Sequence, residues 1–257
     1  MAENEHADGE SGSALLEGFV SVRAALKAGS RPIHAILVRR DKWDRGIAWL
    51  EHAARDGDIP FERADATTID AAVEGTTHGG VIARVGPRRF APLEALGAGA
   101  AAPFVAMLDG VEDPFNFGQA VRALYAAGAH GLVVRPRNWL SAAGIVARAS
   151  AGASEWMPTA VAETALDAAA HFRARGLTIA CTAQQGAMSI YEADLSGPLF
   201  LVIGGERRGI TRSFLDQADL LLEIPYAQPF DQSLGTTAAT AVLAFEVMRQ
   251  RAARIMR

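Results

Sequence analysis

From residue 104 onward, short apolar segments alternate with helix-like segments. The apolar segments are FVAMLD (104–109), GLVV (131–134), LTIACT (177–182), LFLVIG (199–204) and LLLEI (220–224), and helical segments separate them at about 118–128, 141–150, 164–175 and 211–217. Strands that are apolar on both faces and alternate with helices are typical of a parallel sheet covered on both sides. The sequence therefore predicts an α/β fold with a mostly parallel sheet over 104–257, closed by an Ala-rich helix at about 236–256. In such sheets the ligand crevice lies beyond the carboxyl ends of the strands.

The first third of the chain predicts a separate, smaller α/β unit. Residues 15–29 (LLEGFVSVRAALKAG) form an amphipathic stretch, which Gly29 ends as a typical helix stop. An apolar run at 33–38, a helix-like segment RGIAWLEHAARDG and a strand at 80–85 follow. The stretch 86–103 is rich in Pro, Gly and Ala and includes PLEAL, which is typical of a linker with one helical turn. We therefore expect a disordered tail at 1–13, an N-terminal domain at 14–86, a linker at 87–103 and a second domain at 104–257.

Composition limits the compartment and the kinds of site. No apolar run is long enough to cross a bilayer, and residues 1–13 are acidic and small, unlike a signal peptide. Cys181 is the only cysteine and the six histidines are scattered, so we expect neither a disulfide nor a metal cluster. A soluble, cytoplasmic protein without membrane or metal partners is expected.

The net charge of −4 arises from the N-terminal tail, which carries four acidic side chains and no basic one. The rest of the chain has equal numbers of acidic and basic residues. Basic side chains cluster locally, at Arg39, Arg40, Lys42 and Arg45, at Arg84, Arg88 and Arg89, at Arg135 and Arg137, and at Arg249, Arg251, Arg254 and Arg257. Such clusters are either phosphate contacts or solvated faces, and charge alone does not decide between them.

Segments that combine glycines with polar residues follow three of the predicted strands, where a site is expected. They are LDGVEDPFNFG (108–118), with Arg122 one turn into the next helix, IGGERRG (203–209) and IPYAQPFDQSLGTTAA (224–239). Asn116 and Ser233 each have a structural interpretation as a helix N-cap, and two glycines after a strand allow a ligand close to the backbone. The segments lack the Walker phosphate loop, the hydrolase GxSxG and the dinucleotide GxGxxG, which disfavours an oxidoreductase of the Rossmann type.

In this order and spacing, the three segments resemble the three motifs of the SpoU-type (TrmH-like) branch of the SPOUT RNA methyltransferases. The matching stretches are LDGVEDPFNFGQAVRALYAAGAHGLVV, LFLVIGGERRGI and IPYAQPFDQSLGTTAATAV. ARASAGASEWMP (147–158) is similar to the family's segment after its second strand, and the resemblance spans about 104–250. The N-terminal region, particularly GFVSVRAAL and THGGVIARV, is similar to the L30e-like substrate domain often fused to this family.

The resemblance implies an α/β fold with a deep trefoil knot, whose loops at about 201–210 and 222–235 form a pocket for S-adenosylmethionine. The pocket residues that it implies are Thr182, Ala183, Ile203, Gly204, Gly205, Ile224, Pro225, Ser233 and Leu234. The implied reaction is methylation of a ribose 2′-hydroxyl in RNA by a homodimer, without a metal ion.

The resemblance also implies the catalytic residues, which are Asn116, Arg122, Glu206 and Ser233. The Arg122 guanidinium would stabilise the alkoxide that develops at the 2′-oxygen, because arginine stays protonated and is a poor base. Asn116 and Glu206 would orient Arg122 and the ribose, and Ser233 would position the substrate or its own loop.

Three alternatives remain open. Ribosomal RNA of the large subunit is the favoured substrate because of the extra N-terminal domain, and tRNA is the alternative. A narrower form of the ribosomal RNA hypothesis is a resistance enzyme, which protects the large-subunit RNA from a ribosome-targeting antibiotic. The family's third motif usually reads Ser-Leu-Asn, whereas this chain has Ser233-Leu234-Gly235. The missing amide leaves open a catalytically silent RNA-binding or ribosome-assembly factor.

Overall fold

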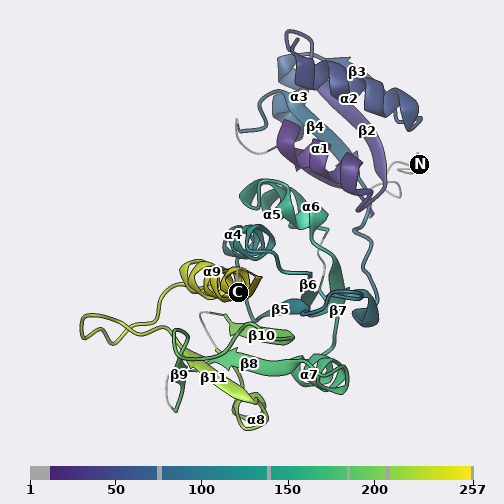
Figure 1. Ribbon diagram of the computed structural model, residues 1–257. Helices are drawn as coiled ribbons and strands as arrows, with labels where there is room; N and C mark the ends of the chain where they lie inside the picture. Colours follow the sequence, from purple (N-terminus) through teal and green to yellow (C-terminus); the bar gives the residue numbers. More distant parts are fainter. Residues whose placement is uncertain (1–11, 74–76, 138–139, 184–185, 206–208, 256–257) are drawn as a thin grey trace, which may run out of the picture. The chain divides into compact units, whose positions relative to one another are not determined.

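The computed structural model describes residues 12–73, 77–137, 140–183, 186–205 and 209–255. The chain divides into two compact units (Figure 1). Unit 1 consists of the described residues of Met1–Arg89 and Asn138–Trp156, and unit 2 of those of Phe90–Arg137 and Met157–Arg257. The domain boundary expected at residue 86 follows the linear order of the elements, so it does not anticipate that residues 140–156 fold with the N-terminal segment.

The described residues of unit 1 form a four-stranded mixed sheet with five helices. The strands β1 (Ala14–Glu17), β2 (Ile33–Arg39), β3 (Phe61–Ala64) and β4 (Val81–Val85) are ordered β1-β4-β2-β3, and only β2 and β3 are parallel. The helices are α1 (Phe19–Ala28), α2 (Arg45–Asp56), α3 (Ala66–Ala72), α5 (Ala143–Ala149) and α6 (Ala153–Trp156). The helix predicted from residue 15 begins at Phe19, because the preceding residues pair with β4 and bury Leu16. It ends as predicted at Gly29, which has a left-handed φ of 57°.

The described residues of unit 2 form a seven-stranded parallel sheet in the order β7-β6-β5-β10-β8-β11-β9. These strands are β5 (Phe104–Asp109), β6 (Gly131–Val134), β7 (Thr159–Val161), β8 (Thr178–Thr182), β9 (Met188–Ser189), β10 (Leu199–Gly204) and β11 (Leu220–Glu223). The helices are α4 (Pro114–Ala126), α7 (Ala165–Ala174), α8 (Arg212–Leu215) and α9 (Thr236–Ile255), and the 3₁₀ turn η1 (Leu93–Ala95) lies in the predicted linker. The parallel α/β fold predicted from the apolar segments is confirmed.

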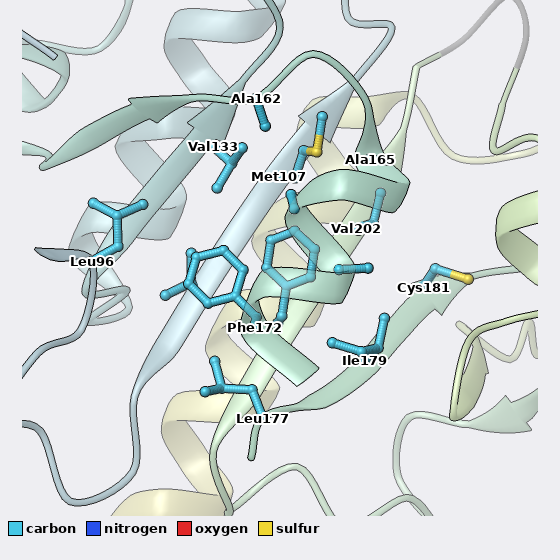
Figure 2. Packing of buried hydrophobic residues seen from close by; sticks show 14 of the residues in the cluster. Leu96, Met107, Val133, Ala162, Ala165, Phe172, Leu177, Ile179, Cys181 and Val202 are labelled. Carbon is cyan, nitrogen blue, oxygen red and sulfur yellow. The ribbon is translucent and has the colours of Figure 1, made fainter. Parts of the chain in front are cut away.

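One hydrophobic core cluster of unit 2 lies between the central strands and α7 (Figure 2). Phe172 of α7 is fully buried and stacks on Phe200 of β10 with ring centroids 4.7 Å apart. Alternate residues of β5, Val105 and Met107, join the same cluster. Since successive side chains of a strand point to opposite faces, the residues between them must be covered from the other side, where α9 packs on β10 and α4. The strands of this sheet are apolar on both faces because helices cover the sheet on both sides.

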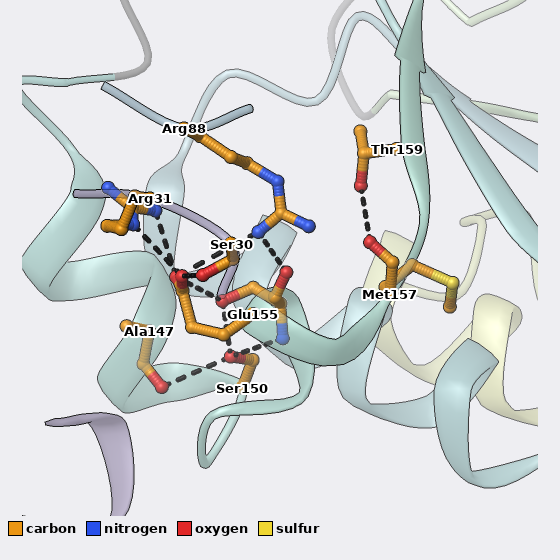
Figure 3. A network of polar contacts seen from close by, with 9 residues as sticks. Ser30, Arg31, Arg88, Ala147, Ser150, Glu155, Met157 and Thr159 are labelled. Atoms are coloured by element: carbon orange, nitrogen blue, oxygen red, sulfur yellow. Dashed lines mark hydrogen bonds and ion pairs between the residues drawn. The ribbon is translucent and has the colours of Figure 1, made fainter. Parts of the chain in front are cut away.

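A buried cluster of charges, the Glu155 network, ties residues 140–156 to the N-terminal segment of unit 1 (Figure 3). Glu155 is 3 % exposed and accepts two hydrogen bonds of 2.9 Å from the Arg31 guanidinium and a third from the Ser30 hydroxyl. The Arg88 guanidinium donates to the Ser154 carbonyl and lies 3.9 Å from a Glu155 carboxylate oxygen. Burial lowers the pKa of Arg88, and the Glu155 charge opposes that shift. One carboxylate is therefore the counter-charge that two buried arginines share.

We expect Glu155→Ala to lower the free energy of unfolding by about 3–5 kcal/mol, because it leaves two buried guanidinium groups facing each other without a counter-charge. Asp41→Ala is the control, since it breaks an exposed pair with Arg39, and exposed ion pairs contribute little to the free energy of unfolding. Urea denaturation followed by circular dichroism measures both. Equal losses for the two variants would contradict this account of the Glu155 network.

Candidate functional site

The parallel pairing of β5 with β10 brings the first and second motif segments together. Gly204 pairs with Asp109 at the carboxyl ends of the two strands, and the Gly205 N–H donates to the Asp109 carbonyl at 2.7 Å. A Cβ atom added to Gly205 would lie 2.0 Å from the carbonyl oxygen of Gly110, too close for any side chain. Gly205 therefore closes two loops against each other, which is a packing reason for the glycine beyond the ligand approach predicted from the sequence.

Asp109 also holds an arginine at this edge of the sheet. Its carboxylate is buried and accepts hydrogen bonds from Nε and Nη2 of Arg135 at 2.6 and 3.1 Å. Arg135 follows the neighbouring strand β6 and is partly exposed. The sequence alone indicates no role for Asp109 and shows Arg135 only as part of a basic cluster. The available signal is an aspartate that ends an otherwise apolar strand, because a buried carboxylate requires a partner.

The first motif continues into α4, whose start is defined by Asp113 and Pro114. The Asp113 carboxylate accepts a 2.7 Å hydrogen bond from the Asn116 N–H, and Pro114 occupies the first helical position. The helix cap is therefore Asp113, and the interpretation of Asn116 as a possible cap is wrong. Asn116 lies inside the first turn of α4.

Arg122 lies on the exposed side of α4, and Gly118, one turn earlier, is buried. Arg122 is six positions after Asn116, which places the two residues about 120° apart around the helix and about 9 Å apart along it. The helix thus does not present them as a neighbouring pair. The predicted orientation of Arg122 by Asn116 would have to act through a substrate held between the two side chains, and it stays a prediction.

The third motif meets the first at the start of α9. The Thr237 hydroxyl donates to the Asn116 carbonyl at 3.4 Å, and α9 packs along α4. The Ala239 N–H donates to the Gly235 carbonyl at 3.0 Å, so helical hydrogen bonding begins at Gly235. Ser233 precedes the helix by three residues and is exposed, so the interpretation of Ser233 as the N-cap is wrong.

Residues 225–235 form an exposed segment between β11 and α9, which extends away from the sheet in Figure 1. The Tyr226 hydroxyl accepts a 2.9 Å hydrogen bond from the Leu234 N–H, and the Tyr226 and Phe230 rings lie 6.0 Å apart. These contacts bring the two ends of the segment together. Pro225, Ser233 and Leu234 of the predicted pocket lie on it. The remaining predicted catalytic residue, Glu206, lies outside the described residues.

The predicted pocket positions fit a neutral heterocycle held by backbone groups. They are uncharged, and most of them lie at the carboxyl ends of the neighbouring strands β10, β8 and β11. Thr182 ends β8 and Ala183 follows it, Ile203 and Gly204 end β10 and Gly205 follows it, and Ile224 and Pro225 follow β11, whereas Ser233 and Leu234 precede α9. The Ala183 N–H donates to the Leu222 carbonyl at 2.9 Å, which ties the ends of β8 and β11 together. Ile203 is buried along its backbone as well as its side chain. The assignment of these residues to S-adenosylmethionine stays a prediction.

Cys181 of β8 precedes this pocket but has no reactive thiol. Burial raises its pKa to about 12, so the thiol stays protonated at neutral pH. Within the described residues, no group of three His, Cys, Asp or Glu side chains could hold a metal ion. No helix among them is long and apolar enough to cross a bilayer.

Comparison with protein families gives two matches. Residues 103–245 match the model described as the SpoU rRNA Methylase family. Residues 15–91 match the model described as RNA 2′-O ribose methyltransferase substrate binding. The matches together cover both units, and the first contains all three motif segments.

Similar proteins extend over nearly the whole chain. The 23S rRNA (guanosine-2′-O-)-methyltransferase RlmB of Shewanella oneidensis is 30 % identical over 92 % of this chain and 97 % of its own length. RlmB of Pseudomonas putida is 31 % identical over 91 % of this chain and 95 % of its own. Among solved structures, the SpoU methyltransferase AviRb from Streptomyces viridochromogenes in complex with AdoMet superposes with a TM-score of 0.79 at 20 % identity, covering 97 % of this chain and 94 % of AviRb. The structural likeness shows the same fold.

We expect Gly205→Ala to destabilise the protein by about 3 kcal/mol or more, because the new methyl group would overlap the Gly110 carbonyl and force the ends of β5 and β10 apart. Gly197→Ala is the control, since a Cβ atom there meets no neighbour within 4 Å. Chemical denaturation measures the free energy of unfolding, and calorimetry measures the Kd for S-adenosylmethionine. If Gly205→Ala were as stable as Gly197→Ala, the close contact between the loops would be wrong.

Proposed function

The chain belongs to the SpoU rRNA methylase family, and from this premise we propose that it methylates the ribose 2′-hydroxyl of a guanosine in 23S rRNA, with S-adenosylmethionine as the methyl donor. The observation that carries the proposal is the end-to-end similarity to proteins named as 23S rRNA guanosine 2′-O-methyltransferases. The match of residues 15–91 to an RNA substrate-binding model supports an RNA substrate independently. Ribosomal RNA is therefore favoured over tRNA.

The chemistry sets what the chain must provide. S-adenosylmethionine supplies a methyl group on a sulfonium sulfur, and because the leaving group is neutral, the transfer itself does not require a metal ion. The 2′-oxygen gains this methyl group and loses its proton to solvent or to a neighbouring phosphate. The remaining barrier is the high pKa of the 2′-hydroxyl, so a fixed positive charge near this oxygen accelerates the reaction.

Arg122 is the residue that we assign to this task. It is exposed on α4 in the first motif, and it is the arginine that the family resemblance implies for this role. It therefore stabilises the developing alkoxide electrostatically and does not remove the proton. Asn116, Glu206 and Ser233 are assigned to orient the ribose and the loops around it.

The Arg122 assignment predicts a separation of catalysis from cofactor binding. We expect Arg122→Ala to lower methyl transfer by about 100-fold or more, as for the loss of one transition-state donor, while the Kd for S-adenosylmethionine changes less than about threefold. Arg122→Lys should recover part of the activity because it restores the charge. Parallel loss of both properties in a folded variant would count against the assignment.

The assay is mass spectrometry of nucleosides from 23S rRNA incubated with the purified protein and S-adenosylmethionine, followed by mapping of the modified position. The wild-type protein should produce 2′-O-methylguanosine. Arg212→Ala serves as the control variant, because Arg212 forms an exposed pair with Asp216 on α8 and carries no predicted role. Methylation of tRNA but not of rRNA, or no methylated nucleoside at all, would overturn the proposed substrate.

We further propose that the protein works in the cytoplasm, where bacterial ribosomal RNA is made, and as a homodimer. Apolar side chains of α9 and of the segment 225–235 support the dimer, since Phe245, Met248 and Phe230 are exposed. Large exposed apolar groups commonly mark protein interfaces. A second copy covering them would remove this surface from water.

The dimer predicts a solution mass of about twice 27.1 kDa in sedimentation velocity. Phe245→Glu should shift the protein to the monomer, because a buried unpaired charge at an interface costs several kcal/mol. Val20→Glu, a similar change at an exposed position of α1, should leave the mass unchanged. A wild-type monomer at micromolar concentration would refute the dimer.

A further inference from the structure

Trp43, in the loop between β2 and α2, is the most exposed large hydrophobic side chain among the described residues. It is 74 % exposed, whereas the other exposed aromatic side chains range from 40 to 59 %. Tryptophan side chains are usually well buried because of their large apolar area. An indole left in water therefore calls for a functional reason, and the neighbours of Trp43 indicate which one.

The indole is supported on one face by an arginine that is itself fixed in place. The Arg63 guanidinium carbon lies 4.0 Å from the centre of the Trp43 ring. Arg63 Nη1 donates to the Lys42 carbonyl at 2.7 Å, and Nη2 lies 3.6 Å from a Glu51 carboxylate oxygen. The guanidinium therefore occupies one face of the ring and restricts its rotation. The high exposure shows that the opposite face is open.

The charges around Trp43 are mixed and nearly balanced. Arg39 pairs with Asp41 at 2.6 Å, and Arg40 pairs with Asp65 at 3.4 Å. A surface that grips a nucleic acid mainly through its phosphates needs an excess of positive charge, which this loop does not have. The chemistry of the open indole face instead selects a flat, uncharged π-system that can stack.

We propose that the open face of Trp43 is a stacking platform for one unpaired base of the RNA substrate, with Arg63 backing the ring. The proposal rests on the proposed function, which makes RNA the substrate. It deepens that function by assigning a binding residue outside the three motifs. Trp43 and Arg63 both lie within residues 15–91, the part of the chain that matches the RNA substrate-binding model. Bases in a duplex are stacked on each other, so only a loop, bulge or strand end can use the platform.

The experiment compares variants for binding to a 23S rRNA transcript and to two short RNA probes, an adenine-rich single strand and a blunt duplex. Trp43→Ala should weaken binding of the transcript and the single strand by about 5- to 100-fold. Trp43→Phe should recover most of this loss because it keeps a π-face. Tyr191→Ala, which removes an exposed aromatic residue of unit 2, should bind as the wild type does. All of these proteins should bind the duplex with the same affinity.

Two further measurements separate stacking from charge and from misfolding. The fold-loss of Trp43→Ala should be the same at low and high salt, because stacking releases no counterions, whereas total affinity falls with salt. In the methylation assay the variant should raise KM for RNA and leave kcat unchanged, as expected for binding that is uniform between ground and transition states. Its melting temperature and its Kd for S-adenosylmethionine should match the wild type.

The platform would be wrong if the wild-type protein methylates RNA and Trp43→Ala binds both the transcript and the single strand normally. It would also be wrong if the loss disappears at high salt, or if Trp43→Ala shifts the sedimentation of the protein instead of its RNA affinity, since the ring would then serve a protein contact. A wild-type protein that neither binds nor methylates RNA refutes the proposed function, and the platform with it.

Discussion

The parallel pairing of β5 with β10 is the constraint on which the site depends. It sets Asp109 and Gly204 side by side, and Gly205 then lies against the backbone of Gly110 with no room for a side chain. These strands are far apart in the sequence, so the first and second motifs meet only because the sheet forms. Once they meet, α4 begins directly beyond β5, and α9 packs on α4 with Thr237 bonded to the Asn116 carbonyl. The third motif is thereby brought to the same edge.

The fold of unit 2 could be predicted because its signals are local. Each of β5, β6 and β10 is a run of apolar residues and glycine, apart from the final Asp109 of β5, and the predicted and observed bounds agree because strands buried on both faces are apolar throughout. Gly29 could likewise be recognised as a helix stop from one residue. The family resemblance supplied what local signals cannot, which is the reaction and the residues that we propose for it.

What could not be predicted depends on partners far away in the sequence. The residues of β1 belong to an amphipathic pattern that favours a helix. They form a strand only because they pair with β4, which lies more than sixty residues later in the sequence. Glu155 is acidic and lies beside Trp156, yet it is buried because Arg31 and Ser30 surround its carboxylate. Arg135 looks like part of a basic cluster until Asp109 is seen beside it. Caps are also ambiguous in sequence, because Asp113 and Asn116 are equally suitable residue types and only the backbone path chooses between them.

The structure shows what glycine does at position 235. In the family motif an asparagine usually stands here, and its loss raises the alternative of a catalytically silent protein. The structure places Gly235 at the position whose carbonyl accepts the first helical hydrogen bond of α9, which is an N-cap position. Asparagine and glycine are both favoured at N-caps, and exchanging one for the other costs only a few tenths of a kcal/mol. The departure therefore leaves the start of α9, and with it the Thr237–Asn116 contact, in place. It removes one side-chain amide, and the hydrogen bonds from Ala239 to Gly235 and from Thr237 to Asn116 form without that amide.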